Sequence, residues 1–237
     1  FPEMVREKLY IRSCKNVSSE VKQYGEIILL DICDTQPADW ASGNATNIRV
    51  RLPAAPEHEI IMHGKGFFWA DRTIGASINV IRCALDLSRM IRMKIEETSE
   101  YKNEILRIAE SVFKTDRRFH IRPECDMSVA VHVLQDWVAD LDKNLVCVHK
   151  DAPVGFLVLK EMASDTLFVH LAAVMEKYQA AGVAIALYAK ALQVAKDGGY
   201  KRLNGRISTL NMSVMNLYAY LGANFFEPED IYLKELK

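Results

Sequence analysis

Residues 166–200 read TLFVHLAAVMEKYQAAGVAIALYAKALQVAKDGGY. This stretch predicts an apolar strand over 166–174, then a loop of small residues, then a helix that the pair Gly198 and Gly199 ends. The apolar residues of the helix recur at the helical period. They are Val183, Ile185, Ala186, Leu187, Ala191, Leu192 and Ala195. The stretch therefore places the N-terminus of an amphipathic helix shortly after a strand.

The loop that precedes this helix reads QAAGVA at 179–184. The first turn of a helix leaves backbone N–H groups without intrahelical partners, and the aligned peptide dipoles add partial positive charge there. A pyrophosphate meets both needs, and small side chains let its oxygens reach the amides. No Lys follows Gly182 as in a Walker P-loop, and one glycine does not make G-x-G-x-x-G. The loop indicates a phosphate site, while a ligand-free start of a packed helix is the structural alternative.

The chain then continues with a second strand and a second helix. Residues 201–208 predict the strand. Residues 211–225 read NMSVMNLYAYLGANF, a short amphipathic helix that Gly222 ends and Phe225 follows.

These segments, in this order, resemble the GNAT superfamily of acetyl-CoA-dependent N-acetyltransferases. The superfamily carries a strand ending L-A-A-V, a loop [R/Q]-x-x-G-x-[G/A], a helix, a strand, and then N-x-x-A-x-x-L-Y-x-x-x-G-F. The corresponding residues here are 171–174, 179–184 and 211–225, with Val214 in the place of the small residue. The departures are Gln179 where Arg is commoner, Ala180 and Ala184 where Gly is commoner, and Glu176 where proline is frequent.

The resemblance implies an α/β fold, with a mixed, mostly antiparallel twisted sheet flanked by helices. It implies acetyl-CoA as co-substrate and no metal. The pyrophosphate would lie on the amides of Gln179, Ala180, Ala181, Gly182, Val183 and Ala184. The peptide-like pantetheine arm would pair with the strand edge at Ala172, Ala173 and Val174, where that strand splays from its neighbour. Asn211 would bind a pantetheine amide, cap its helix, or do both.

Two side chains are candidates for proton transfer. Tyr218 falls on the tyrosine of the L-Y pair, and the resemblance assigns it to protonating the leaving thiolate. An ordinary core tyrosine is the alternative, because apolar residues share its helix. His170 precedes the cofactor-pairing segment and would titrate near neutral pH, so it is a candidate base. A structural histidine, with water removing the proton, is the alternative.

The sequence upstream of these motifs suggests the acceptor. Residues 118–123 read RFHIRP and precede a predicted helix with Trp137, while residues 152–156 read APVGF. Together with GFFWADRT at 66–73, this order resembles the dTDP-fucosamine acetyltransferases and implies an amino group on a nucleotide-linked sugar. Arg118, Phe119 and His120 would then line the acceptor pocket, since a phosphate suits a guanidinium and a base suits an aromatic face. Placement on the surface is the alternative for these three.

The remaining elements suggest two domains, with a smaller N-terminal α/β domain over 1–115 and the GNAT domain over 116–237. The boundary lies in the charged turn 114–118. The other expected strands cover 26–33, 48–52, 59–63 and 67–87, the expected helices are 99–113, capped by Ser99, and one capped by Asp126 that continues to Leu141, and a hairpin turns at 149–153.

Bulk properties exclude several classes of protein. The chain has 30 basic and 31 acidic residues, so no overall charge attracts nucleic acid or an anionic membrane. Its five cysteines are scattered, which argues against a zinc site or a disulfide framework and favours a reducing compartment. No apolar run is long enough to span a bilayer and no signal peptide opens the chain, so we expect a soluble, cytoplasmic protein. The chain begins with Phe1 rather than Met, which leaves the native N-terminus open.

Other functions remain open at this point. The acceptor could be another small amine, an amino acid or a protein N-terminus, and the chain could also be a non-catalytic acyl-CoA-binding domain or a purely structural one. No cysteine lies in a motif with a His that would activate it, so direct attack of the amine in a ternary complex is expected. A homodimer is common in the superfamily, and no residue tests it.

Overall fold

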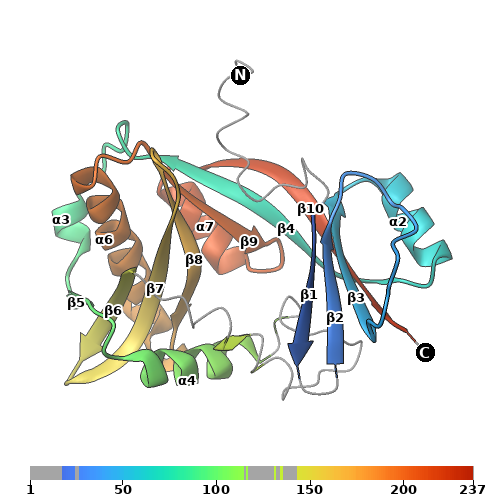
Figure 1. The fold of residues 1–237 in the computed structure, drawn as a ribbon. Coiled ribbons are helices and arrows are strands. Elements are labelled where there is room, and N and C mark those ends of the chain that lie inside the picture. Colours follow the sequence, from blue (N-terminus) through green and yellow to red (C-terminus); the bar gives the residue numbers. More distant parts are fainter. Residues whose placement is uncertain are drawn as a thin grey trace.

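The computed structural model describes residues 18–24, 27–114, 116, 131, 134–135 and 143–236. Their strands form a 10-stranded sheet in the order β1-β2-β3-β10-β4-β9-β8-β7-β6-β5 (Figure 1). The strands are β1 (Ser18–Tyr24), β2 (Ile27–Cys33), β3 (Asn47–Pro53), β4 (Phe68–Asn79), β5 (Lys94–Glu97), β6 (Lys143–His149), β7 (Ala152–Ala163), β8 (Thr166–Val174), β9 (Arg202–Ser208) and β10 (Asn224–Glu235). The helices are α2 (Pro56–Gly64), α3 (Leu87–Met90), α4 (Lys102–Phe113), the 3₁₀ helix η2 (Glu176–Ala181), α6 (Val183–Asp197) and α7 (Met212–Tyr220).

The sheet is mixed and mostly antiparallel, as expected. Among the described strands, the parallel pairs are β2 with β3 and β8 with β9, and every other pairing is antiparallel. The helix predicted after Gly182 and the strand predicted over 166–174 are present with those bounds.

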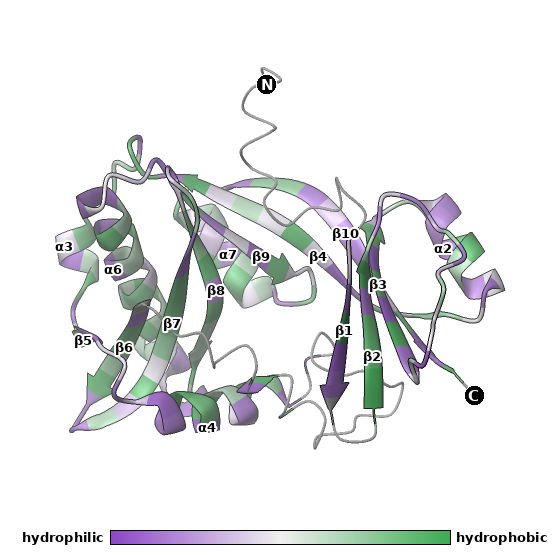
Figure 2. Cartoon of the chain, viewed as in Figure 1, coloured by the Kyte–Doolittle hydropathy of each residue, from purple (hydrophilic) through white to green (hydrophobic). Residues whose placement is uncertain are grey.

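Helices cover both faces of the part of the sheet from β9 to β6. On one face α6 buries Leu187 and Leu192 against β6, β7 and β8 in a core that also holds Tyr218 of α7. On the other face α4 buries Ile105 and Phe113 against the same strands. Burying one leucine side chain contributes about 2 kcal/mol, so these two layers fix the strands that carry the site. Figure 2 shows that hydrophobic residues predominate in β6, β7 and β8, the strands that α4 and α6 flank.

A strand, a short helix and a long strand occur twice with matching lengths. In β3, α2 and β4 the elements have 7, 9 and 12 residues, and β9, α7 and β10 have the same lengths. The two long strands pair with each other, while β4 also pairs with β9 and β10 with β3. Each long strand thus lies beside the first strand of the other unit. Strands from before and after residue 115 belong to this one sheet. The expected division into two domains stays a prediction.

Some predicted elements differ from the structure. The strand expected over 59–63 is part of α2, because Pro56 in the first turn and the acidic residues Glu57 and Glu59 favour a helix start. The strand expected over 67–87 ends at Asn79. The helix expected from Ser99 begins at Lys102. Ile185 was counted with the buried face of its helix but is 37% exposed. Most of the helix predicted after Asp126 lies outside the described residues.

The cysteines also depart from the expectation. Cys33 is disulfide-bonded, whereas Cys83 and Cys147 are free thiols. Pairing depends on how close two Cβ atoms come in the fold, which spacing along the chain does not reveal. In the described ranges, no helix combines the length and the apolar character that crossing a bilayer requires.

Candidate active site

The site lies where the two parallel strands β8 and β9 part. They pair from Thr166 with Arg202 to Val169 with Gly205, and the pairing stops there. His170 is the extra residue of a β-bulge at this point, because Leu159 of β7 faces Val169 while Val158 faces Leu171. A bulge bends its strand and redirects side chains. The edge of β8 beyond Val169 is therefore open toward β9.

A cavity of about 50 Å³ occupies this opening. This volume holds only a few water molecules. Its walls come from β8, β9, α7, α6 and the end of α4. The lining residues are Phe113, Val169, His170, Leu171, Ala172, Tyr188, Arg206, Ile207, Ser208, Asn211, Val214 and Tyr218. The predicted residues His170, Ala172, Asn211 and Tyr218 are thus brought together.

Tyr218 is the most constrained of these side chains. It is fully buried, and its ring meets that of Tyr188 edge to face at a centroid distance of 5.2 Å. A Cβ atom built on Gly205 would lie 2.0 Å from the Tyr218 hydroxyl oxygen, so this hydroxyl occupies the space that a side chain at 205 would fill. Burial, together with Tyr188, raises the pKa of Tyr218 well above its usual value. The phenol therefore stays protonated at neutral pH and remains a hydrogen-bond donor.

The predicted phosphate loop has the geometry of a helix N-terminus that is open to a ligand. Gly182 adopts a left-handed conformation, with φ of 78°, between η2 and α6. Its carbonyl accepts the first helical hydrogen bond, from Ala186 N at 3.0 Å, which leaves the amides of Val183, Ala184 and Ile185 without intrahelical partners. Gln179, Ala180 and Ala181 are exposed beside them. The side chain of Gln179 donates to the carbonyl of Val174 at 3.3 Å and ties the loop to the end of β8.

A glycine on β7 fixes the start of α6 against the sheet. A Cβ atom on Gly155 would lie 2.9 Å from Val183 Cγ1 and 3.1 Å from the carbonyl oxygen of Ala173. Only glycine therefore lets the first residue of α6 pack this close to β7 and β8. The free amides of α6 and the open edge of β8 consequently lie next to each other. This combination fits the pyrophosphate and the peptide-like arm of acetyl-CoA.

Asn211 closes the site on the side of β9. Its Oδ1 accepts a hydrogen bond from Val214 N at 3.1 Å, which makes Asn211 the N-cap of α7. Asn211 therefore caps α7, as predicted, and it also lines the cavity. Its role toward pantetheine stays a prediction.

The residues predicted for the site and those found in it differ in part. Arg118, Phe119 and His120 lie outside the described residues. Sequence reasoning missed Gly205, Tyr188 and Arg206. A glycine inside a predicted strand signals close approach by another group, so Gly205 could have been recognised. No sequence pattern marks the other two.

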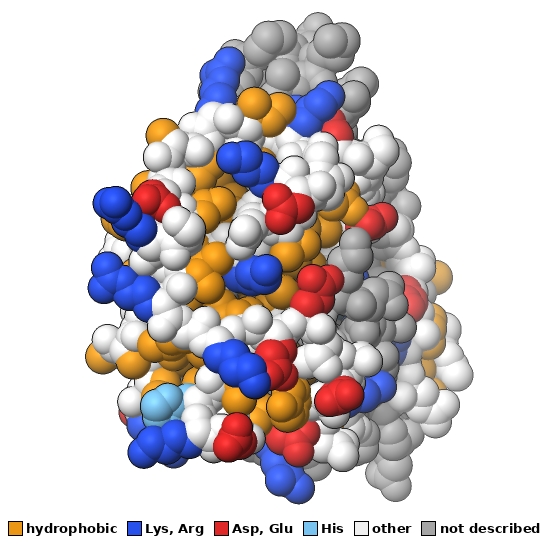
Figure 3. Space-filling view, turned by 90° about the vertical axis from the view of Figure 1, so that its left-hand side faces the viewer, with side chains coloured by type: hydrophobic (Ala, Val, Ile, Leu, Met, Phe, Trp, Pro, Cys, Tyr) orange, Lys and Arg blue, Asp and Glu red, His pale blue; other side chains and the backbone are white. Residues whose placement is uncertain are grey.

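Other parts of the described structure show no comparable cluster of the predicted site residues. A larger cavity, of about 330 Å³, lies between the α3 region and the end of α6, with Leu85, Leu87 and Leu192 among its walls, and none of the predicted site residues lines it. Figure 3 shows the face that carries α3, α6 and β5, where side chains of both charges are interspersed. Within the described ranges, no group of three or more His, Cys, Asp and Glu side chains could hold a metal ion.

Comparison with known proteins agrees with this geometry. Residues 106–223 match the profile of the Acetyltransferase (GNAT) family. No curated protein matches the chain. A structure of a protein of unknown function from Staphylococcus epidermidis ATCC 12228 is 15% identical and covers 98% of this chain and 97% of its own, with a TM-score of 0.65.

Two further structures share the fold. A tandem GNAT protein from the clavulanic acid biosynthesis pathway is 9% identical, with a TM-score of 0.62 over 92% of this chain and 78% of its own. A GCN5-related N-acetyltransferase from Sphaerobacter thermophilus is 15% identical, with a TM-score of 0.56 over 80% of this chain and 59% of its own. At these identities the likeness concerns the fold alone. Since the family profile covers β8, α6, β9 and α7, which build the open strand pair, the chain belongs to the GNAT superfamily and is an N-acetyltransferase.

Proposed function

We propose that this enzyme transfers the acetyl group of acetyl-CoA to a primary amine, in the opening between β8 and β9, by direct attack. The observation that carries the proposal is the place of Tyr218. Its hydroxyl lies against Gly205, at the last paired residues of the two strands and next to the free edge of β8. A proton donor therefore lies beside the opening between β8 and β9, where the thioester would bind.

The chain's own groups would hold acetyl-CoA as follows. The amides of Val183 and Ala184, with the exposed loop 179–182, would bind the pyrophosphate, because they are the unpartnered donors of the first turn. Backbone groups at Ala172, Ala173 and Val174 would pair with the pantetheine arm. An N–H of this segment would polarise the thioester carbonyl, and Asn211 would contact the arm from across the opening.

The proton transfers would involve two side chains. The amine nitrogen attacks the thioester carbon, a C–N bond forms and the C–S bond breaks. His170, at the bulge, or water takes the proton of the amine, and Tyr218 supplies one to the sulfur. Both groups then exchange protons with solvent. The raised pKa of Tyr218 keeps the phenol protonated at neutral pH, so its hydroxyl is present as a hydrogen-bond donor when the sulfur leaves.

For the acceptor we propose an amino group on a nucleotide-linked sugar. The support is the sequence pattern of Arg118, Phe119 and His120, which offers a cation and an aromatic ring. Another small amine or an amino acid is the second candidate. The two differ in whether thiol release from acetyl-CoA requires the nucleotide, which a comparison of the sugar nucleotide with the free amino sugar measures.

The first test is calorimetric titration of the protein with acetyl-CoA. Gly182→Asp adds a negative charge where the phosphates would lie, whereas Gly182→Asn has the same shape without the charge. Both residues tolerate a left-handed backbone better than other side chains do, so strain is matched between them. We expect micromolar binding to the wild type, weakened far more by Asp than by Asn. Equal loss in both variants would refute a phosphate at this loop.

A non-catalytic acyl-CoA-binding role is the rival that Tyr218→Phe separates from catalysis. The rival requires that acetyl-CoA binds and that no amine accelerates thiol release. Acetyl transfer by the wild type, lost in this variant with binding intact, would exclude the rival.

A further inference from the structure

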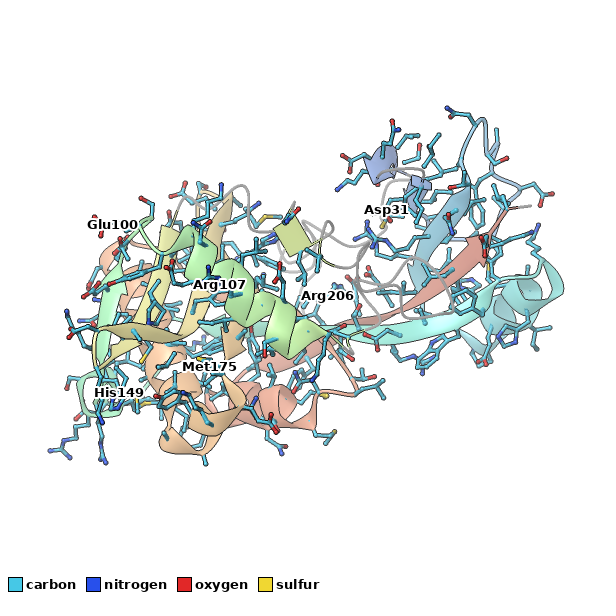
Figure 4. All side chains as sticks on the ribbon, turned by 90° about the horizontal axis from the view of Figure 1, so that it is seen from below. Asp31, Glu100, Arg107, His149, Met175 and Arg206 are labelled. Carbon is cyan, nitrogen blue, oxygen red and sulfur yellow. The ribbon has the colours of Figure 1, made fainter. Side chains whose placement is uncertain are left out.

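Arg206 is a partly buried cation in the wall of the site, and the proposed chemistry does not use it. It follows Gly205 on β9, its side chain is only 15% exposed, and it lines the same cavity as His170 and Tyr218. Because side chains alternate along a strand, it leaves β9 on the face opposite to that on which Tyr218 covers Gly205. Figure 4 shows Arg206 beside the end of α4, away from α6 and the phosphate loop. It therefore lies on the side of the sheet opposite to the proposed acetyl-CoA site.

Among the described residues, one nitrogen of this guanidinium makes all of its hydrogen bonds and its ion pair. Nη1 donates to the carbonyl oxygen of Glu227 at 3.1 Å and to Thr73 Oγ1 at 3.4 Å, and it lies 3.1 Å from Glu229 Oε2. Glu229 is itself buried. Nη1 thus anchors the group, and Nε and Nη2 make no hydrogen bond with the described residues. These two nitrogens form one edge of the planar group, with their N–H bonds directed side by side.

Two other arginines of the chain show what this edge binds. Arg72 uses Nε and Nη2 to hold the two carboxylate oxygens of Asp230, at 2.7 and 2.8 Å. Arg49 holds Asp31 in the same way, at 3.1 and 2.6 Å. Arg206 lines the cavity, and this edge is the part of its guanidinium that has no partner among the described residues. A two-pronged donor of this kind matches a carboxylate or a phosphate.

A second cation adds to the local charge. Burial lowers the pKa of Arg206, Glu229 raises it, and the charge of Arg51 lowers it. An arginine stays charged under all these influences. Arg51 of β3, whose Nη2 lies 3.6 Å from Asp31 Oδ2, thus adds positive charge to the surroundings of Arg206.

We propose that Nε and Nη2 of Arg206 bind an anionic group of the acceptor, a carboxylate or a phosphate, while its amine reaches the opening between β8 and β9. This inference rests on the proposed acetyl transfer. It adds that the acceptors carry a negative charge near the amine. It assigns Arg206 to acceptor binding and leaves acetyl-CoA binding to the loop before α6.

The test is a calorimetric titration of the CoA-saturated protein with inorganic phosphate and, separately, with acetate. Saturation with CoA removes the phosphate loop as a competing site. Arg206→Lys keeps the charge beside Glu229 and loses the two-pronged edge, and Arg89→Lys is the matched change at an exposed arginine. We expect one of the two ions to bind the wild type and to bind Arg206→Lys about tenfold more weakly or worse, with no change in Arg89→Lys.

The two ions distinguish the sources of the anion. Phosphate binding favours a phosphorylated or nucleotide-linked acceptor, and acetate binding favours an amino acid or another amino carboxylate. No binding of either ion to the wild type, or equal binding to Arg206→Lys, would overturn the proposal. Because the titration requires no acetyl transfer, its failure is separable from failure of the proposed function. If CoA does not bind, the same titration is run on the unliganded protein and still reports on Arg206.

Discussion

The hydroxyl of Tyr218 fills the place of the missing side chain at Gly205, with 2.0 Å between the hydroxyl oxygen and the position a Cβ would take. Gly205 is also the last residue of β9 that pairs with β8. Gly205 therefore lies where the pairing of β8 and β9 ends, and its missing side chain leaves room there for the hydroxyl of Tyr218, the proposed acid. The next tyrosine atom, Cζ, would lie 2.9 Å from the same Cβ.

Gly205→Ala should destabilise the protein by about 1–3 kcal/mol, because a methyl group and a buried hydroxyl would compete for one space. Urea unfolding measures this change. The cost should be smaller in the Tyr218→Phe background, where the hydroxyl is absent, and the double-mutant cycle gives the coupling. Equal costs in both backgrounds would show that the hydroxyl does not limit residue 205.

Tyr218→Phe should lower kcat for acetyl transfer by about 10²-fold or more, since general acid catalysis contributes factors of this size. The Kd for acetyl-CoA should stay the same, because backbone amides hold the cofactor. Tyr220→Phe is the control, as Tyr220 lies on the same helix but is 60% exposed. An unchanged kcat in the Tyr218 variant would assign the tyrosine to the core alone.

The pH dependence of kcat should show no loss from ionisation of Tyr218 below about pH 10. Burial and Tyr188 raise the pKa of this phenol above the ordinary value of 10.0, and the protonated form, which is the donor, persists below the raised pKa. Stopped assays between pH 6 and about 9.5 test this. A decline near pH 8 that Tyr218→Phe abolishes would contradict it.

The free energy of unfolding should depend on pH through the ionisation of Asp31. Burial opposes its charge, but Arg49 and Arg51 outweigh burial and lower its pKa from 3.8 to about 2. Because the folded-state pKa is depressed, the contribution is complete above about pH 5 and is lost as pH falls through 3.8 toward 2. The shift corresponds to about 2 kcal/mol.

The measurement is the free energy of unfolding of wild type and Asp31→Asn between pH 6 and about 2.5. The difference between them should shrink as pH falls. Asp39→Asn, which removes an exposed carboxylate with 94% of its side chain accessible, should leave the pH dependence almost as it is in the wild type. A constant difference for Asp31→Asn would mean that its charge is not stabilised in the fold.

Acetyl-CoA should bind one site per chain. The unit of β3, α2 and β4 has the lengths of the unit of β9, α7 and β10, yet its seventh helical residue is Met62, where α7 has Tyr218. The parallel strands β2 and β3 are joined by 34–46 rather than by a phosphate loop and a long helix. A calorimetric stoichiometry near 2 would contradict this prediction.

The sequence was sufficient to predict the elements from β8 to α7 because their signals are local. The strand over 166–174, the helix after Gly182 and the cap at Asn211 follow from apolar periodicity and from the chemistry of single residues. The residues around Tyr218 were only partly predictable. Tyr188 reaches it from another helix, and the bulge at His170 depends on the register with β7, so both require the tertiary structure.

The N-terminal part was harder to predict for a related reason. Residues 59–63 read EIIMH, and this short apolar run predicts a strand, whereas Pro56 and the acidic first turn favour a helix. The neighbours of β3 and β4 include β10, which is distant in sequence, and no local pattern announces such a pairing.

The place of β10 has a consequence for how the chain is made. This strand is synthesised last among the elements described, yet it separates β3 from β4 in the middle of the sheet. While the ribosome still holds residues 224–235, β3 and β4 each expose an edge that only β10 can cover. Closure of the sheet must therefore wait until that strand emerges, and a stalled or shortened chain would present two open edges to its neighbours instead of a folded enzyme.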